Sequence, residues 1–137
     1  MQKLSRGFTL IELLVVIAII GILAAVVLAS LNDARDSGSD ASAKTSMNNV
    51  RSQAEIYYNN NGFTYDGTTA DACTDADVAT LLNAAGAQTG NTADCDFTAT
   101  AYAAEIQLRN NNFFCVDSTG FSGEQAATKG ATATVCN

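Results

Sequence analysis

The feature that most constrains this chain is a run of 24 residues, Phe8–Leu31, that contains a single charged residue, Glu12. As an α-helix the run is about 36 Å long, which is enough to cross the roughly 30 Å hydrocarbon core of a bilayer. A carboxylate inside such a span costs about 2.5–3.5 kcal/mol on insertion scales and marks a functional residue. The run therefore predicts a membrane-spanning helix in which Glu12 has a specific role.

The charges of the chain are divided unevenly around this run. Residues 1–7 are short, polar and basic, with Lys3 and Arg6, and positive charge before a span keeps that end in the cytoplasm. Without these two, the chain has five basic and fourteen acidic residues, a net charge of −9. Such a surface repels phosphate groups, so nucleic acid is an unlikely partner over most of it.

Four cysteines follow the apolar run: Cys73, Cys95, Cys115 and Cys136. The chain has no histidine and no C-x-x-C pair, which argues against a zinc site. An even cysteine count beside an export-type N-terminus indicates two disulfides formed outside the cytoplasm. Of the three possible pairings we expect nearest neighbours, Cys73–Cys95 and Cys115–Cys136, because they close compact loops worth roughly 3 kcal/mol each.

The polar part of the chain begins at Asn32 and retains a helical pattern up to about residue 61. One apolar stripe has the spacing 4, 3, 4, 3 of a helix face that packs on a core, at Ala43, Met47, Val50, Ala54 and Tyr57. The segment Ser37–Asp40 is a poor helix former and is a possible break. Asn59–Gly62 predicts the end of the helix.

The remainder predicts a short helix and three strands. Asp77–Gly86 has the pattern of a helix capped by Asp75 or Asp77. Alternation favours a strand within 99–108, followed by a turn at 109–112 and a second strand at 113–117. We expect a polar loop over 118–130 and a last strand at Ala131–Cys136. The predicted fold class is α+β, with a long N-terminal helix packed against a small antiparallel sheet.

The N-terminal residues carry a family resemblance. Gly7-Phe8-Thr9-Leu10-Ile11-Glu12, after a basic leader and before a long apolar run, resembles the prepilin signal of type IV pilins and of the related pseudopilins, a match confined to about residues 1–31. The resemblance implies a pilin-like fold with a leader at 1–7, a transmembrane and filament-core helix at 8–31, and a globular head at 32–137. It also implies cleavage between Gly7 and Phe8 by a prepilin peptidase and N-methylation of Phe8.

The resemblance suggests a role for Glu12. In the family the matching glutamate is thought to pair with the N-terminal amine of a neighbouring subunit during assembly. The alternative is a pair with the amine of its own Phe8, four residues away on the same helix face. The chain departs from many pilins at Ala29, where they carry a proline, so that Gly21 is the only helix-weakening residue of the run.

The function implied by the resemblance is structural. The chain would be a subunit that polymerises through its N-terminal helix into a type IV pilus for adhesion, motility or DNA uptake. The alternative is a major pseudopilin of a secretion-type or competence pseudopilus. Either subunit would start as a single-pass inner-membrane precursor handled by assembly machinery, and a pilin would end on the cell surface. We expect no enzyme activity, no cofactor and no metal.

Other interpretations explain fewer of these features. A secretory signal peptide or an ordinary membrane anchor would account for the apolar run, but not for Gly7, Phe8 and Glu12 together. Clustered acids, including Asp117 and Glu124, could ligate calcium, but no loop has a recognisable ligand spacing. We therefore expect solvated acidic loops. A membrane-anchored binding domain unrelated to pilins would differ in one respect, because it would not be cleaved after Gly7.

Overall fold

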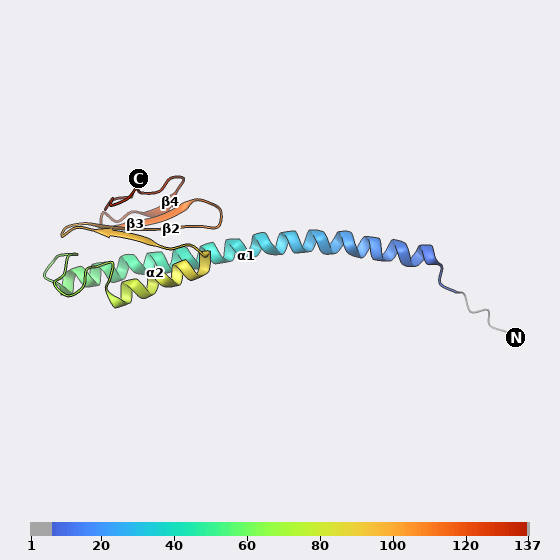
Figure 1. Ribbon diagram of the computed structural model, residues 1–137, viewed down its shortest axis with the longest axis horizontal. Helices are drawn as coiled ribbons and strands as arrows, with labels where there is room; N and C mark the ends of the chain where they lie inside the picture. Colours follow the sequence, from blue (N-terminus) through green and yellow to red (C-terminus); the bar gives the residue numbers. More distant parts are fainter. Residues whose placement is uncertain (1–6, 137) are drawn as a thin grey trace. The chain divides into compact units, whose positions relative to one another are not determined.

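The computed structural model describes residues 7–136, and the chain divides into two compact units between Arg35 and Asp36. We call residues 7–35 the stem and residues 36–136 the head. The elements in chain order are the helices α1 (Leu10–Asn60) and α2 (Ala76–Thr89), then the strands β1 (Asp94–Phe97), β2 (Tyr102–Gln107), β3 (Phe113–Asp117) and β4 (Ser122–Gln125) (Figure 1). The α+β, pilin-like fold class predicted from the sequence is confirmed.

Helix α1 differs from the expected helix at its start and in its middle. It begins at Leu10 rather than Phe8, and Ser37–Asp40 is helical, so the expected break is absent. Asp40 is buried and its carboxylate accepts the backbone N–H of Arg109 at 2.8 Å. This tertiary contact outweighs the poor helix propensity of the segment. The predicted end is confirmed, because α1 ends at Asn60.

Helix α2 is longer than the sequence pattern indicated. Asp75 caps it by accepting the backbone N–H groups of Asp77 and Val78. The helix passes Gly86 and ends at Thr89, where Gly90 takes the left-handed conformation (φ 82°). The glycine with the left-handed backbone therefore ends the helix, whereas Gly86 lies inside it.

The four strands form one antiparallel sheet in the order β1-β2-β3-β4. The predicted hairpin is confirmed, with Ala103 opposite Asp117 and Gln107 opposite Phe113. The expected strand at Ala131–Cys136 is wrong, because that segment has no strand. Two strands were missed: β1 lies in a region expected to be loop, and β4 lies within the expected polar loop 118–130.

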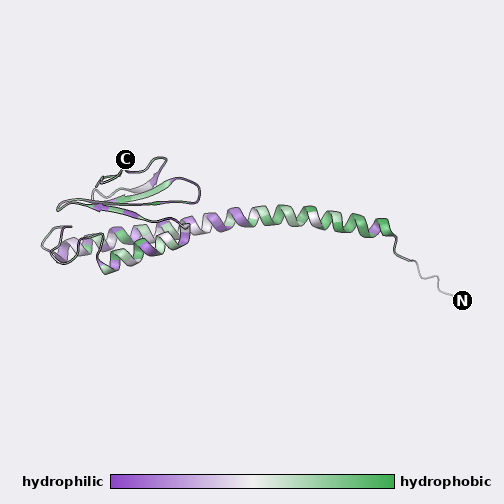
Figure 2. Cartoon of the chain, viewed as in Figure 1, coloured by the Kyte–Doolittle hydropathy of each residue, from purple (hydrophilic) through white to green (hydrophobic). Residues whose placement is uncertain are grey.

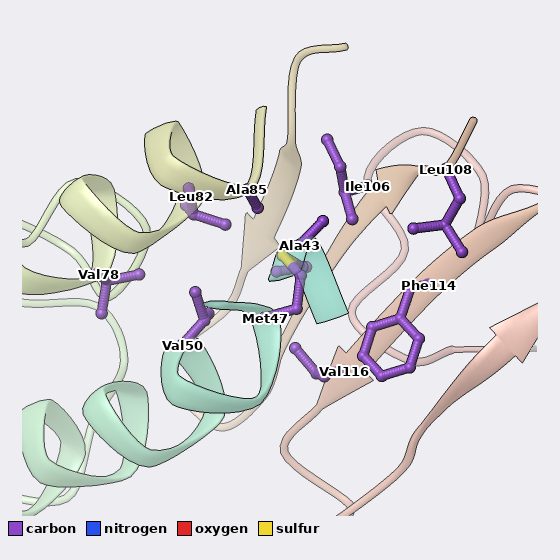
Figure 3. Packing of buried hydrophobic residues seen from close by; sticks show 11 residues of the cluster. Ala43, Met47, Val50, Val78, Leu82, Ala85, Ile106, Leu108, Phe114 and Val116 are labelled. Atoms are coloured by element: carbon purple, nitrogen blue, oxygen red, sulfur yellow. The ribbon is translucent and has the colours of Figure 1, made fainter. Parts of the chain in front are cut away.

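The core of the head lies between the two helices and one face of the sheet (Figure 3). The predicted stripe of α1 is buried as expected. The main cluster contains Ala43, Met47, Val50, Val78, Leu82, Ala85, Ala104, Ile106, Leu108, Phe114 and Val116. A second cluster joins Ala54 and Tyr57 to Tyr65, Ala72 and Tyr102. The helix face that the sequence marked as apolar is therefore the face that packs.

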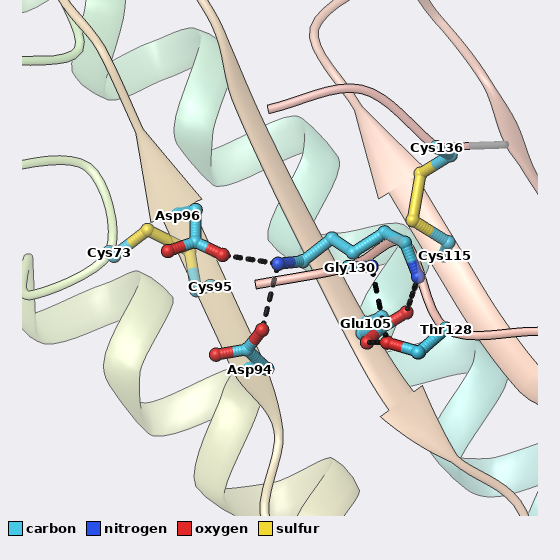
Figure 4. A network of polar contacts seen from close by, with 10 residues as sticks. Cys73, Asp94, Cys95, Asp96, Glu105, Cys115, Thr128, Gly130 and Cys136 are labelled. Carbon is cyan, nitrogen blue, oxygen red and sulfur yellow. Dashed lines mark hydrogen bonds and ion pairs between the residues drawn. A yellow bond between two sulfur atoms is a disulfide. The ribbon is translucent and has the colours of Figure 1, made fainter. Parts of the chain in front are cut away.

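The other face of the sheet is covered by the segment that follows β4. Lys129 is buried, and its ammonium contacts the carboxylates of Asp94 and Asp96 on β1 (Figure 4). Its backbone N–H donates to the buried Glu105 at 2.7 Å, and Thr128 donates to the same carboxylate. Burial opposes the charged ammonium, but the hydrogen bonds from Asp94 and Asp96 leave the pKa of Lys129 raised.

We predict that Lys129 stabilises the head far more than a surface lysine does. Lys129→Met keeps the apolar stem of the side chain but removes a charged hydrogen-bond donor, so the free energy of unfolding should fall by about 1–3 kcal/mol. Lys44→Met is the matched control, since Lys44 pairs with Glu124 at a partly exposed site and should cost less than about 1 kcal/mol. Chemical denaturation in detergent measures both, and equal losses would contradict the prediction.

Candidate functional site

The stem exposes apolar side chains on every face of its helix. Its large apolar residues are between 46% exposed at Val16 and 76% exposed at Phe8, and the hydrophobic colouring of Figure 2 covers this part of α1 on its visible side. The most apolar 18-residue window has a mean hydropathy of 3.1, and none of it is buried. By length and composition the helix can cross a membrane. A surface of this kind requires lipid or other apolar helices around it.

The N-terminus of α1 is closed by a reciprocal pair of hydrogen bonds between Thr9 and Glu12. The backbone N–H of Thr9 donates to Oε2 of Glu12 at 2.9 Å, and the Thr9 hydroxyl donates to the same oxygen at 2.7 Å. In return the backbone N–H of Glu12 donates to Oγ1 of Thr9 at 3.3 Å. This is a capping box, in which the first and fourth residues satisfy each other's free backbone groups.

The capping box changes the interpretation of Glu12. In the uncut chain its carboxylate is hydrogen-bonded by Thr9, so the glutamate also fixes where the helix begins. The sequence analysis missed Thr9 because it placed the helix start at Phe8. The available signal was the spacing Thr-x-x-Glu directly before the apolar run.

The bond between Gly7 and Phe8 lies outside the helix. Gly7, Phe8 and Thr9 have no regular secondary structure, and Phe8 is strongly exposed. A Cβ atom added to Gly7 would contact nothing within 4 Å, so packing within this chain does not require a glycine there. Lys3 and Arg6 lie outside the described residues.

The cysteines of the head are joined in the nearest-neighbour pairing, Cys73 to Cys95 and Cys115 to Cys136. The first disulfide ties the segment before α2 to β1. The second ties the end of the described chain to β3, and the two flank the polar network of Figure 4. Together with Lys129 they attach both loop-rich segments of the head to the sheet.

The acidic residues considered as calcium ligands are engaged by donors of the same chain. Asp117 accepts the backbone N–H groups of Thr119, Phe121 and Cys136. Burial opposes the charge of Asp117, but these bonds and the Thr119 hydroxyl leave its pKa lowered. The side-chain hydrogen bond from Lys44 is the main cause of the lowered pKa of Glu124. Over residues 7–136 no three metal-ligating side chains gather into a group.

A capped apolar helix with exposed sides, on an α+β head closed by two disulfides, defines the class of pilin-like subunits with an N-terminal membrane helix. Comparison with known proteins narrows the class. Residues 2–28 match the prokaryotic N-terminal methylation motif. The resemblance to type IV pilins that Gly7, Phe8 and Glu12 predict is thereby confirmed for the N-terminal part of the chain.

Curated relatives agree with this family. The chain is 46% identical over 61 residues to the type IV wide pilus major component PilA4 of Thermus thermophilus, covering 44% of this chain and 47% of the relative. It is 38% identical over 79 residues to the type IV major pilin PilE of Neisseria gonorrhoeae, covering 57% of this chain and 47% of the relative. A fimbrial protein of Neisseria meningitidis serogroup B is equally similar, with 46% of the relative covered.

The chain spans about half the length of these curated relatives. No solved structure matches it.

We predict that Thr9 holds the first turn of α1 in place. Thr9→Val keeps the shape of the side chain but removes the hydroxyl, whereas Thr9→Ser keeps the hydroxyl. Loss of a capping hydroxyl costs about 0.5–2 kcal/mol of local stability. Amide hydrogen exchange of residues 9–12 in detergent micelles should therefore be faster in Thr9→Val and unchanged in Thr9→Ser. Equal exchange in the two variants would show that the capping box does not order this end.

Proposed function

We propose that this chain is a structural subunit that polymerises through its stem into a type IV pilus filament. The observation that carries the proposal is the apolar stem helix, whose exposed faces need lipid before assembly and neighbouring helices afterwards. The similarity to major pilins supports a filament over a pseudopilus. The acidic head would then form the outer surface of the filament.

Maturation would begin with cleavage of the Gly7–Phe8 bond by a prepilin peptidase, followed by N-methylation of Phe8. The position of this bond supports the proposal, because it lies before the first residue of α1 and is not held in helical hydrogen bonds. The glycine on one side removes a Cβ atom, which allows close approach of the backbone to an enzyme. The match to the methylation motif includes both residues.

Cleavage would give Glu12 a second partner. Before the cut, its carboxylate accepts hydrogen bonds from Thr9 alone. The cut creates an ammonium group at Phe8, and a buried carboxylate without a counter-charge is strongly unfavourable. We infer that in the filament Glu12 pairs with the ammonium of a neighbouring subunit, which would set the axial register of each added stem.

The location and partners follow from this sequence of events. The precursor would lie in the inner membrane as a single-pass protein, with the assembly machinery beside it. The finished filament would extend from the cell surface and contain many copies of this chain. The head would meet the exterior, where both disulfides can persist.

We predict that the mature protein starts at Phe8 and carries one methyl group on its terminal nitrogen. Intact-mass and N-terminal peptide analysis of the membrane-extracted protein measures this directly. A Gly7→Leu variant should remain at full length, because a side chain at this position blocks close approach of the backbone. An uncut wild-type chain, or a cut at any other bond, would refute the proposed maturation.

We predict that the charge of Glu12, and not only its capping, is needed for assembly. Glu12→Leu removes both functions, whereas Glu12→Gln retains a capping acceptor but cannot pair with an ammonium. Both variants should accumulate in the membrane and give a low yield of sheared filaments, measured by electron microscopy and by immunoblotting. A normal filament yield from Glu12→Leu would contradict the role of this residue, and a normal yield from Glu12→Gln would reduce it to capping.

A further inference from the structure

A polar cleft in the head is not used by stem assembly. It has a volume of about 440 Å³ and lies between α1 and the turn that joins β3 to β4. Its lining residues are Arg51, Ser52, Glu55, Asp117, Ser118, Thr119 and Gly120. This volume is within the range of small-molecule sites, about 300–1,000 Å³.

One polar group beside the cleft has no hydrogen-bond partner. The side chain of Tyr102 is 1% exposed, and its hydroxyl is buried without a partner. Burial, followed by the negative charge of Glu55, raises the pKa of this phenol, and Arg51 also acts on it. The two residues that influence the hydroxyl therefore line the cleft. A buried hydroxyl without a partner is unfavourable, and a ligand in the cleft would satisfy it.

The two charges of α1 that line the cleft are separate from each other. Arg51 and Glu55 are four residues apart, a spacing at which opposite charges on a helix often pair. Within the part of the chain that the structure describes, they form no ion pair. Instead Nη1 of Arg51 donates to the carbonyl of Gly120 at 3.1 Å, and Oε1 of Glu55 accepts the Tyr65 hydroxyl at 2.7 Å.

The remaining hydrogen-bonding capacity selects the type of ligand. Four of the five guanidinium N–H donors of Arg51 and the second oxygen of Glu55 make no hydrogen bond within the described residues. Asp117 is engaged by Thr119, Phe121 and Cys136. An anion would be attracted by Arg51 but repelled by Glu55, and a cation would meet the reverse. A neutral hydroxyl both donates and accepts, so adjacent hydroxyls can bind both residues and Tyr102.

We propose that this cleft is a carbohydrate-binding site, which takes a neutral sugar through adjacent hydroxyls held by Arg51, Glu55 and Tyr102. The site is formed by the head alone and does not depend on cleavage, methylation or polymerisation. It would give each subunit of a filament one weak contact with a glycan, and many copies along a filament would add these contacts together.

The test uses the full-length, uncut chain in micelles of a detergent without a sugar headgroup. D-galactose, D-glucose and N-acetyl-D-glucosamine are titrated separately, with sodium phosphate and putrescine as charged probes, and NMR follows the Arg51 side chain and the Gly120 amide. At least one sugar should give saturable shifts, and the two charged probes should give none. Absence of saturation with all three sugars, or saturation only with a charged probe, would overturn the proposal.

Variants separate the site from nonspecific binding. Arg51→Gln should abolish the saturable shifts, and Lys44→Gln, on the same helix but outside the cleft, should leave the affinity unchanged. Tyr102→Phe keeps the ring and should weaken sugar binding roughly three- to tenfold. The same variant should have an equal or higher unfolding midpoint without sugar, because it removes an unsatisfied hydroxyl.

Two further outcomes would contradict the site. A lower unfolding midpoint of Tyr102→Phe would show that the hydroxyl already has a partner in the protein. Shifts at Arg51 and Gly120 that grow with protein concentration in the absence of sugar would show that a second copy of the chain occupies the cleft. Neither outcome bears on processing at Phe8, which the mass analysis tests separately.

Discussion

The exposed apolar surface of the stem is the constraint on which the rest of the molecule depends. Side chains such as Ile11 and Val27 are 72% and 62% exposed, and the hydrophobic effect strongly opposes leaving a surface of this extent in water. The head does not need this surface, because its own core is closed by α2 and the sheet. The two units are therefore suited to different surroundings: the head to water, and the stem to lipid or other apolar helices.

A single helix serves both surroundings through a change of side chains. Up to Leu31 apolar residues occur on all faces of α1, and from Ala43 onward only one stripe is apolar. Helical hydrogen bonds are the same in both parts, so the backbone continues while the environment of the side chains changes. The head also holds this helix through Arg109, whose guanidinium contacts Asp36 on α1 and the carbonyl of Gln88 on α2.

The elements that were predicted from the sequence are those whose burial produces a periodic pattern. The stripe of α1 and the hairpin of β2 and β3 bury regularly spaced apolar residues. Strands β1 and β4 have the sequences Asp-Cys-Asp-Phe and Ser-Gly-Glu-Gln, with no such pattern, and they pair through their backbones at the sheet edges. Ala131–Cys136 imitates a strand by alternation, but Lys129 and the Cys115–Cys136 disulfide hold that region. Contacts between distant residues leave no local signal.

Glu12 shows the same limit in the functional site. Its charge within an apolar run made it visible, whereas Thr9 was missed because a hydroxyl at a helix end is unremarkable without its partner. Capping alone does not explain a charge at this position, because a glutamine accepts the same backbone N–H and is easier to bury than a carboxylate. A carboxylate is better than an amide only where it meets a positive group. The capping box therefore accounts for the acceptor at residue 12, and a terminal ammonium formed by cleavage would account for its charge.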